Sequence, residues 1–283
     1  MDDDSTTMPK GVAIFSAVIG WAYTFFWTVS FYPLLISNIR RRSTHGVSVD
    51  FCLLNLLGMT AYAIYNITMR FSPVVRRQYA ARNPLNPTPI VQSNDVAYAL
   101  HGLFISAAIY SQFYPRLWGF DTAKPSRISP WCSLVFWGCI IAALVGAFVA
   151  VLVPYSQSWM WLDVIYLVGN IKTFLTLLKY IPQTWLNYKR KSTQGLPLLP
   201  FALDIAGASL SLLQLLIDSA YSSNQPTALS NPVKLLLAYV TICFDLVFFF
   251  QHYVLYRNAT DDDLLDGRHA GEEDHRLLET ELR

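Results

Sequence analysis

The chain has 283 residues, of which 53% are hydrophobic, 14% aromatic and only 14% charged. This composition excludes an ordinary water-soluble domain and favours a chain that lies mostly in lipid. The formal net charge of +2 gives no support for a nucleic-acid-binding protein, which would carry a strong basic excess.

Seven apolar segments are long enough to form membrane-spanning helices. Uncharged segments cover residues 11–37, 51–69, 96–115 and 131–160, each near or above the roughly 18 to 20 residues that cross hydrocarbon. Three further segments, at about 159–180, 196–217 and 235–256, contain ionisable groups. We therefore predict an all-α membrane protein with seven transmembrane helices. The first helix follows an acidic leader and is too long for a cleavable signal peptide.

Two segments of the chain are copies of each other. Residues 33–58 match residues 182–207 without a gap, at a constant offset of 149. The identical positions are Pro33, Asn38, Arg41, Ser43, Thr44, Gly46, Leu54 and Gly58 in the first copy and Pro182, Asn187, Arg190, Ser192, Thr193, Gly195, Leu203 and Gly207 in the second. The pattern predicts a duplicated transporter with two parallel three-helix bundles, helices 1–3 and 5–7, joined by linker helix 4.

The duplication also predicts the domain boundaries and the orientation. We expect a short lumenal leader (1–10), a first repeat (11–115), a cytosolic loop with linker helix 4 (116–157), a second repeat (158–257) and a disordered cytosolic tail (258–283). The basic loops fall on one side of the membrane, which the positive-inside rule makes cytosolic. Their basic residues are Arg40, Arg41, Arg42, Arg116, Lys124, Arg127, Lys189, Arg190, Lys191 and Arg257. The N-terminus is then lumenal and the C-terminus cytosolic, although residues 71–93, on the lumenal side, contain three arginines.

Ionisable groups inside the predicted helices are the most informative residues. They are Lys172, Lys179, Asp204 and Asp245. Each would cost about 2.5 to 3.5 kcal/mol if it faced lipid at the bilayer centre, so we expect them to face an interior cavity. Lys172 and Lys179 are seven residues apart, which places them on one helix face.

The repeat relates several of these polar positions. Asn55 and Asp204 are 149 residues apart and are therefore equivalent, whereas Asp95 and Asp245 are 150 apart and are interpreted as near-symmetric partners. A cavity with two ammonium groups, a carboxylate and an amide suits a zwitterionic ligand. The alternative is that lysine and aspartate only neutralise each other between helices.

Prolines mark the expected moving parts. Pro33 and Pro182 stand one to two turns before the end of the first helix of each repeat, where a proline kinks a helix. We predict hinges there, with Gln183 in the second, for alternating access around a central site. The sequence has no phosphate-binding loop, nucleophile elbow, zinc-protease motif or dinucleotide fingerprint. It therefore predicts a protein that is not an enzyme, with no cofactor and no metal.

The second loop, YIPQ followed by NYKRKSTQG, resembles a PQ-loop. More narrowly, the blocks SFYPLLISNIRRRSTHGVSVDF, SNDVAYALHG, KTFLTLLKYIPQ and LDIAGASLSLLQ are similar to the cystinosin family. The resemblance implies proton-coupled export of cystine from the lysosome. It implies a substrate site at Asn55, Lys172, Lys179 and Asp204. It also links Asp204 and Asp95, and more loosely Asp245, to proton coupling.

Some positions depart from the family pattern. The first loop has Leu34 in place of the glutamine, and Pro200 replaces an asparagine of the substrate site. The tail has an acidic dileucine pattern at Glu273, Leu277 and Leu278, which sorting adaptors would recognise. We expect a multi-pass protein of the lysosomal or vacuolar membrane, in contact with lipid, that binds L-cystine and protons.

Two other functions remain open at this stage. One is export of cationic or other amino acids by the same superfamily, which the two lysines disfavour through charge repulsion. The other is a pH-dependent seven-helix cargo receptor, which would bind its ligand without net transport. Flux measurements with a panel of amino acids separate these alternatives.

Overall fold

The computed structural model describes residues 9–84, 87, 89, 91, 93–120, 127–152, 159–220 and 232–257, and all regular structure in this part of the chain is helical. The helices are α1 (Lys10–Ser30), α2 (Tyr32–Arg41), α3 (Val49–Phe71), α4 (Pro73–Arg82), α5 (Ser93–Ser111), α6 (Pro115–Trp118), α7 (Pro130–Leu152), α8 (Trp161–Leu178), α9 (Tyr180–Arg190), α10 (Leu199–Ala220), α12 (Pro232–Phe250) and the π-helix η1 (Gln251–Leu255).

Helices occur at each of the seven expected positions. Four helical stretches are long and apolar enough to cross a membrane: Lys10–Arg41, Val49–Phe71, Pro130–Leu152 and Trp161–Arg190. Leu199–Gln214 and Tyr239–Leu255 are shorter apolar helices. The chain is thus an all-α membrane protein, while the count of seven crossings and the two-bundle arrangement stay predictions.

The first helix of each repeat is interrupted near its proline. α1 gives way to α2 at Phe31, and α8 gives way to α9 at Lys179. Both half-helices then end in a left-handed residue, Arg42 and Lys191, each with φ of 48°. The two copies therefore share the same break and the same stop.

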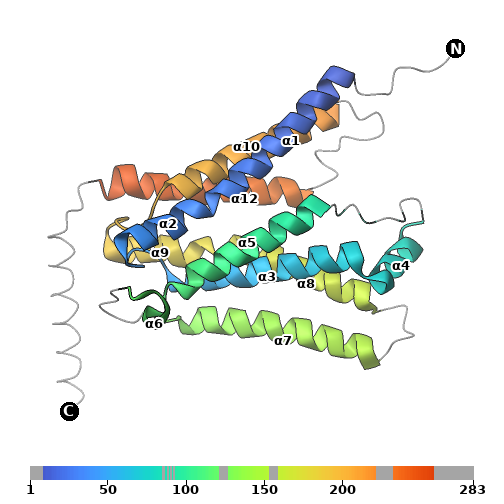
Figure 1. Cartoon of the computed structure of the whole chain (residues 1–283), viewed down its shortest axis with the longest axis horizontal. Helices are drawn as coiled ribbons and strands as arrows, with labels where there is room; N and C mark the ends of the chain where they lie inside the picture. Colours follow the sequence, from blue (N-terminus) through green and yellow to red (C-terminus); the bar gives the residue numbers. More distant parts are fainter. Residues whose placement is uncertain are drawn as a thin grey trace.

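Packing crosses between the repeats. α1 lies along α10, and α3 lies along α8, so the first helix of each repeat packs on the second helix of the other (Figure 1). Within the repeats, α3 packs on α5 and α10 packs on α12, while α7 packs on α8. The matched glycines stand at the crossings: Gly58 of α3 faces the side chain of Lys172 on α8, and Gly207 of α10 faces Trp27 on α1.

We predict that Gly207→Ala destabilises the protein by about 1 to 3 kcal/mol, because overpacking forces side chains or backbone to shift. An added Cβ would lie 2.6 Å from Cδ1 and Nε1 of the rigid Trp27 ring. Gly138→Ala on α7 is the matched control, since nothing lies within 4 Å of its added Cβ. Thermal unfolding in detergent measures both variants, and equal midpoints would contradict the prediction.

The two matched loops contact each other at the α2/α9 end. The Arg41 guanidinium donates to the carbonyl oxygens of Gly195 (2.6 Å) and His45 (2.9 Å). Gly46 and Gly195 have φ of 97° and 88°, and a Cβ on either would clash with backbone of the other loop. Glycine is therefore required at both positions for the close approach.

A buried amide network closes the same end. Gln183 accepts from the amide of Ser48 (2.7 Å) and donates to the Gly46 carbonyl (3.0 Å) and to Oδ1 of Asn187 (2.9 Å). Asn187 in turn donates to Gln251 (2.8 Å), whose amide bonds the backbone of α9. One side chain thus joins the second repeat to the loop of the first.

The first repeat has the equivalent asparagine–glutamine contacts but has no counterpart of Gln183. Asn38 donates to Gln112 (2.9 Å), and Gln112 donates to the Leu35 carbonyl (3.2 Å). This copies the contacts of Asn187 and Gln251 in the second repeat. Leu34 occupies the position of Gln183 and is buried in an apolar cluster instead.

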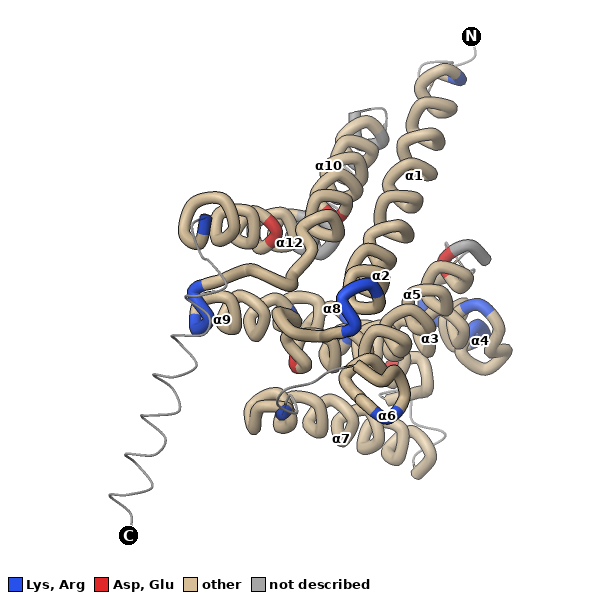
Figure 2. The backbone as a smooth tube through the Cα atoms, turned by 60° about the vertical axis from the view of Figure 1, so that its left-hand side comes forward, with Lys and Arg blue, Asp and Glu red and all other residues tan. Residues whose placement is uncertain are grey.

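Charges gather at helix ends. In Figure 2, Lys and Arg cluster at the ends of α2 and α9, while the long helices are almost uncharged. The segment 71–93, with its three arginines, contains α4, a helix that the sequence reasoning missed. Arg82 there donates to both oxygens of Asp163, at 2.5 and 2.8 Å, so this charge is paired with the start of α8.

Candidate functional site

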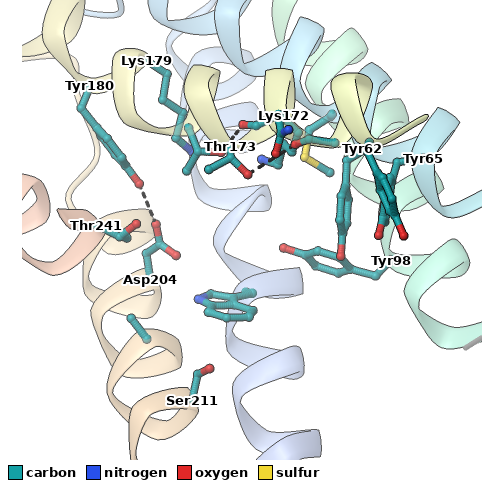
Figure 3. A pocket seen from close by; sticks show the side chains of 17 residues that line it. Tyr62, Tyr65, Tyr98, Lys172, Thr173, Lys179, Tyr180, Asp204, Ser211 and Thr241 are labelled. Atoms are coloured by element: carbon teal, nitrogen blue, oxygen red, sulfur yellow. Dashed lines mark hydrogen bonds between the residues drawn. The ribbon is translucent and has the colours of Figure 1, made fainter. Parts of the chain in front are cut away.

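A cavity of about 790 Å³ lies between α1, α3, α5, α8 and α10 (Figure 3). Lys172, Lys179 and Asp204 line it, so the structure brings together three of the four residues that the sequence assigns to a substrate site. A smaller cavity of about 80 Å³ adjoins it and is lined by Asn55 and Pro200. Lys179, Tyr180 and Asp204 line both cavities.

The charged groups of the site are close but not directly paired. Lys179 Nζ donates to Asn55 Oδ1 at 3.3 Å and lies 4.8 Å from the centre of the Tyr180 ring. The Tyr180 hydroxyl donates to Asp204 at 3.1 Å. No ion pair within 4.0 Å joins Lys172 or Lys179 to Asp204. The lysines therefore act on Asp204 through their charge without a direct contact.

Lys172 occupies a separate position along the same helix. Its ammonium lies 5.9 Å from the centre of the Tyr62 ring, and its side chain passes Gly58 of α3. Lys172 of α8 and Lys179 at the break between α8 and α9 both face the cavity, as their spacing of two turns predicts (Figure 3). The cavity therefore offers two positive groups at different depths.

Asp245 lies in the protein interior rather than on the cavity wall. It is fully buried, and neither carboxylate oxygen has a hydrogen-bond partner among the described residues. The charges of Asp204 and Lys179 act on its carboxylate. Asp245 is thus electrostatically connected to the site without lining it.

The expected pairing of Asp95 with Asp245 is wrong. The third helices are related by an offset of 139, since Gln112 and Gln251 make the same contacts in the two repeats. Asp245 therefore corresponds to Ser106, which accepts a hydrogen bond from Asn55 at 2.9 Å. The connecting segment of the first repeat, 72–92, is ten residues longer than 221–231 in the second, which shifts the offset.

Asp95 lies elsewhere. It stands in the first turn of α5, its charge acts on Tyr62, and it is absent from the described residues that line the cavity. The hinge candidates Pro182 and Gln183 are buried in α9, and Pro33 is in the first turn of α2. Glu273, Leu277 and Leu278 of the sorting pattern lie outside the described residues.

Comparison with known proteins agrees with this arrangement of two repeats. The PQ loop repeat family model matches residues 15–75 and 164–223. The Cystinosin homolog of Dictyostelium discoideum is 36% identical over 249 residues, covering 88% of this chain and 84% of that protein. The chain belongs to the cystinosin family.

Two further relatives extend the comparison. Cystinosin of Bos taurus is 36% identical over 258 residues, covering 90% of this chain and 67% of that protein. The Cystine transporter of Saccharomyces cerevisiae is 28% identical over 257 residues, covering 87% of this chain and 95% of that protein.

The sequence reasoning missed the aromatic wall of this cystinosin-family site. Trp27, Tyr62, Tyr98 and Tyr166 line the cavity together with Met59. A signal was present, since Met59 and Tyr62 follow Asn55 by four and seven residues and so share its helix face. Tyr180, directly before Ile181 and Pro182, also escaped notice.

Proposed function

We propose that this protein exports L-cystine, together with protons, from the lumen of the lysosome or vacuole to the cytosol by alternating access. The observation that carries the proposal is the cavity of about 790 Å³, which is lined by two lysines and by Asp204 with no lysine-to-Asp204 ion pair within 4.0 Å. A zwitterionic amino acid supplies the missing partners, because the lysines attract its carboxylates and Asp204 receives its ammonium. The names of the bovine and yeast relatives support cystine as the ligand.

The aromatic and thioether side chains support the same choice. Met59, Trp27 and Tyr62 line the cavity between the polar groups. Aromatic rings and sulfur contact each other favourably, so this wall suits the disulfide body of cystine. A cationic substrate fits less well, since the two lysines would repel its second positive charge.

Proton coupling is assigned to the carboxylates of the second repeat. Asp204 lines the cavity and Asp245 is buried beside it, at positions where the first repeat has the hydrogen-bonded Asn55 and Ser106. A proton bound from the acidic lumen removes one negative charge before the carrier reorients across the membrane. Asp95, near Tyr62, is the second candidate for a proton site.

Alternating access requires the α2/α9 end to open. In the structure, contacts of Gln183 and Arg41 hold the two matched loops together there. The breaks at Phe31 and Lys179, next to Pro33 and Pro182, are the points at which the half-helices would swing. We assign this end to the cytosol, with the N-terminus lumenal, because its loops are basic.

Counterflow in proteoliposomes tests the proposed function. Purified protein with an acidic internal pH and internal unlabelled cystine is expected to accumulate labelled cystine, and Lys179→Met is expected to reduce the rate at least tenfold. Lys189→Met is the matched control, because Lys189 is an exposed residue of α9 whose ammonium lies over Trp185. Saturable binding without flux would identify a receptor, and faster exchange of arginine or lysine would identify a cationic carrier.

A further inference from the structure

The short helix α4 has one face that packs on the protein. Val75 lies in one apolar cluster with Leu162, and Gln78 accepts a hydrogen bond from the Leu162 amide at 2.9 Å. Arg82 forms the ion pair with Asp163. These three residues of α4 are spaced three and four apart, so they share one side of the helix. α4 is therefore held against the start of α8, at the periphery of the bundle (Figures 1 and 2).

The opposite face of α4 carries two arginines. Pro73, Arg76 and Arg77 are all exposed, and their spacing of three and four residues places them together on the side away from α8. We call these three residues the outer face of α4. Neither arginine has an acidic partner within 4.0 Å among the described residues. The outer face therefore presents two positive charges to an external anion.

The outer face lies at the membrane surface. α3, which is long and apolar enough to cross a membrane, ends at Phe71, and α4 begins two residues later. Arg76 and Arg77 are five and six residues beyond that end, a rise of at most about 9 Å along a continuous helix. The headgroup layer on each side of the hydrocarbon is about 5 to 8 Å thick. The guanidinium groups, at the ends of long side chains, can therefore reach the lipid phosphates.

Exposed apolar side chains border the arginines. Phe71 is 61% exposed and Val74 is 49% exposed, and both precede the arginines in the chain, on the side of the hydrocarbon. A soluble anion would leave these side chains uncovered, whereas a phospholipid supplies a phosphate and acyl chains together. Arginine suits the phosphate because its planar fork can donate two hydrogen bonds to one phosphate group. The combination favours a lipid over a soluble ligand.

We propose that the outer face of α4 binds an anionic phospholipid of the adjoining leaflet, with the two arginines on its phosphate and Phe71 and Val74 against its acyl chains. This gives the arginines a role on a side of the membrane where the positive-inside rule predicts few basic residues. A bound lipid also fixes α4 to the bilayer, and with it the start of α8, to which α4 is joined by its ion pair. The inference does not depend on which solute is transported.

Photo-crosslinking from position 71 tests the site. The full-length carrier, with p-benzoylphenylalanine in place of Phe71, is reconstituted in equal amounts of phosphatidylglycerol and phosphatidylcholine, and lipid adducts are counted by mass spectrometry. We expect phosphatidylglycerol adducts to exceed phosphatidylcholine adducts by roughly threefold or more, and Arg76→Gln together with Arg77→Gln to reduce the ratio to about one. The same photoreactive group at Phe148 of α7, which is 62% exposed, is the control and should show no preference.

Thermal unfolding supplies an independent readout. Phosphatidylglycerol added to the carrier in neutral detergent should raise the midpoint by several degrees, and Arg76→Gln together with Arg77→Gln should remove roughly half of this shift or more. With phosphatidylcholine alone, this double variant should unfold at the wild-type midpoint, because exposed arginines without an ion pair contribute little to the fold.

Three results would overturn the lipid site. The first is equal crosslinking of both lipids from position 71. The second is loss of the phosphatidylglycerol adducts in excess inorganic phosphate, which would identify a site for a soluble anion. The third is a lower midpoint of the double variant in phosphatidylcholine alone, which would show that the arginines serve the fold instead.

Discussion

Asp204→Asn is expected to reduce proton-driven cystine transport at least tenfold and to abolish the response of the remaining flux to a pH gradient. The asparagine keeps the size of the side chain and an oxygen that accepts from Tyr180, which donates to Asp204 at 3.1 Å. It cannot take up a proton or attract an ammonium group. A tenfold loss corresponds to about 1.4 kcal/mol of transition-state stabilisation.

The measurement is uptake into proteoliposomes with and without an imposed pH gradient. Asp245→Asn is the companion variant, since Asp245 is buried beside the site but does not line the cavity. If the two carboxylates share one coupling proton, both variants lose the gradient response, whereas only Asp204→Asn loses the ammonium contact and with it affinity for cystine. Gradient-driven uptake by Asp204→Asn at wild-type strength would exclude Asp204 as a coupling residue.

Gln183→Leu is expected to destabilise the closed α2/α9 end by about 3 kcal/mol or more. The substitution gives the second repeat the residue that the first repeat has at Leu34, but here three buried groups lose their partners. They are the Ser48 amide, the Gly46 carbonyl and Oδ1 of Asn187. Each buried group left without a hydrogen bond costs about 1 to 3 kcal/mol.

Thermal unfolding of the purified carrier should show a midpoint several degrees lower for Gln183→Leu. Trp185→Leu is the control, because Trp185 is 55% exposed on the same helix and makes none of these contacts. A second readout is labelling of a cysteine placed at Ser48, which should become faster when the loops separate. Unchanged unfolding together with unchanged labelling would mean that Gln183 does not hold the loops together.

Much of the fold could be predicted from the sequence, because an uncharged stretch of about twenty residues has the length and the polarity of a membrane-spanning helix. It also placed Lys172, Lys179 and Asp204 in one cavity, since the cost of exposing charge to lipid leaves few alternatives. Helix ends were harder to predict. The helices run on to Arg41 and Arg190, beyond the expected ends of the apolar segments at residues 37 and 180, because basic residues are favourable in the last turn of a helix.

Contacts between segments that are distant in the chain could not be predicted from the sequence. An offset of 149 relates the first two helices of each repeat, but the longer connection containing α4 changes it to 139 for the third, so Asp95 was paired with the wrong residue. The wall of tyrosines was missed for another reason. Aromatic residues are common throughout membrane helices, and only the three-dimensional packing shows which of them face the cavity.

The exchange of partners between repeats has a consequence for biosynthesis. α1 packs along α10, and the two are separated by most of the chain, so a ribosome completes α1 to α9 before the partner of α1 exists. Within its own repeat, α1 contacts α5 and α8 contacts α12 less extensively than each contacts the second helix of the other repeat. Insertion into the membrane must therefore precede assembly, and a truncated polypeptide ending before α10 leaves α1 in lipid without its partner.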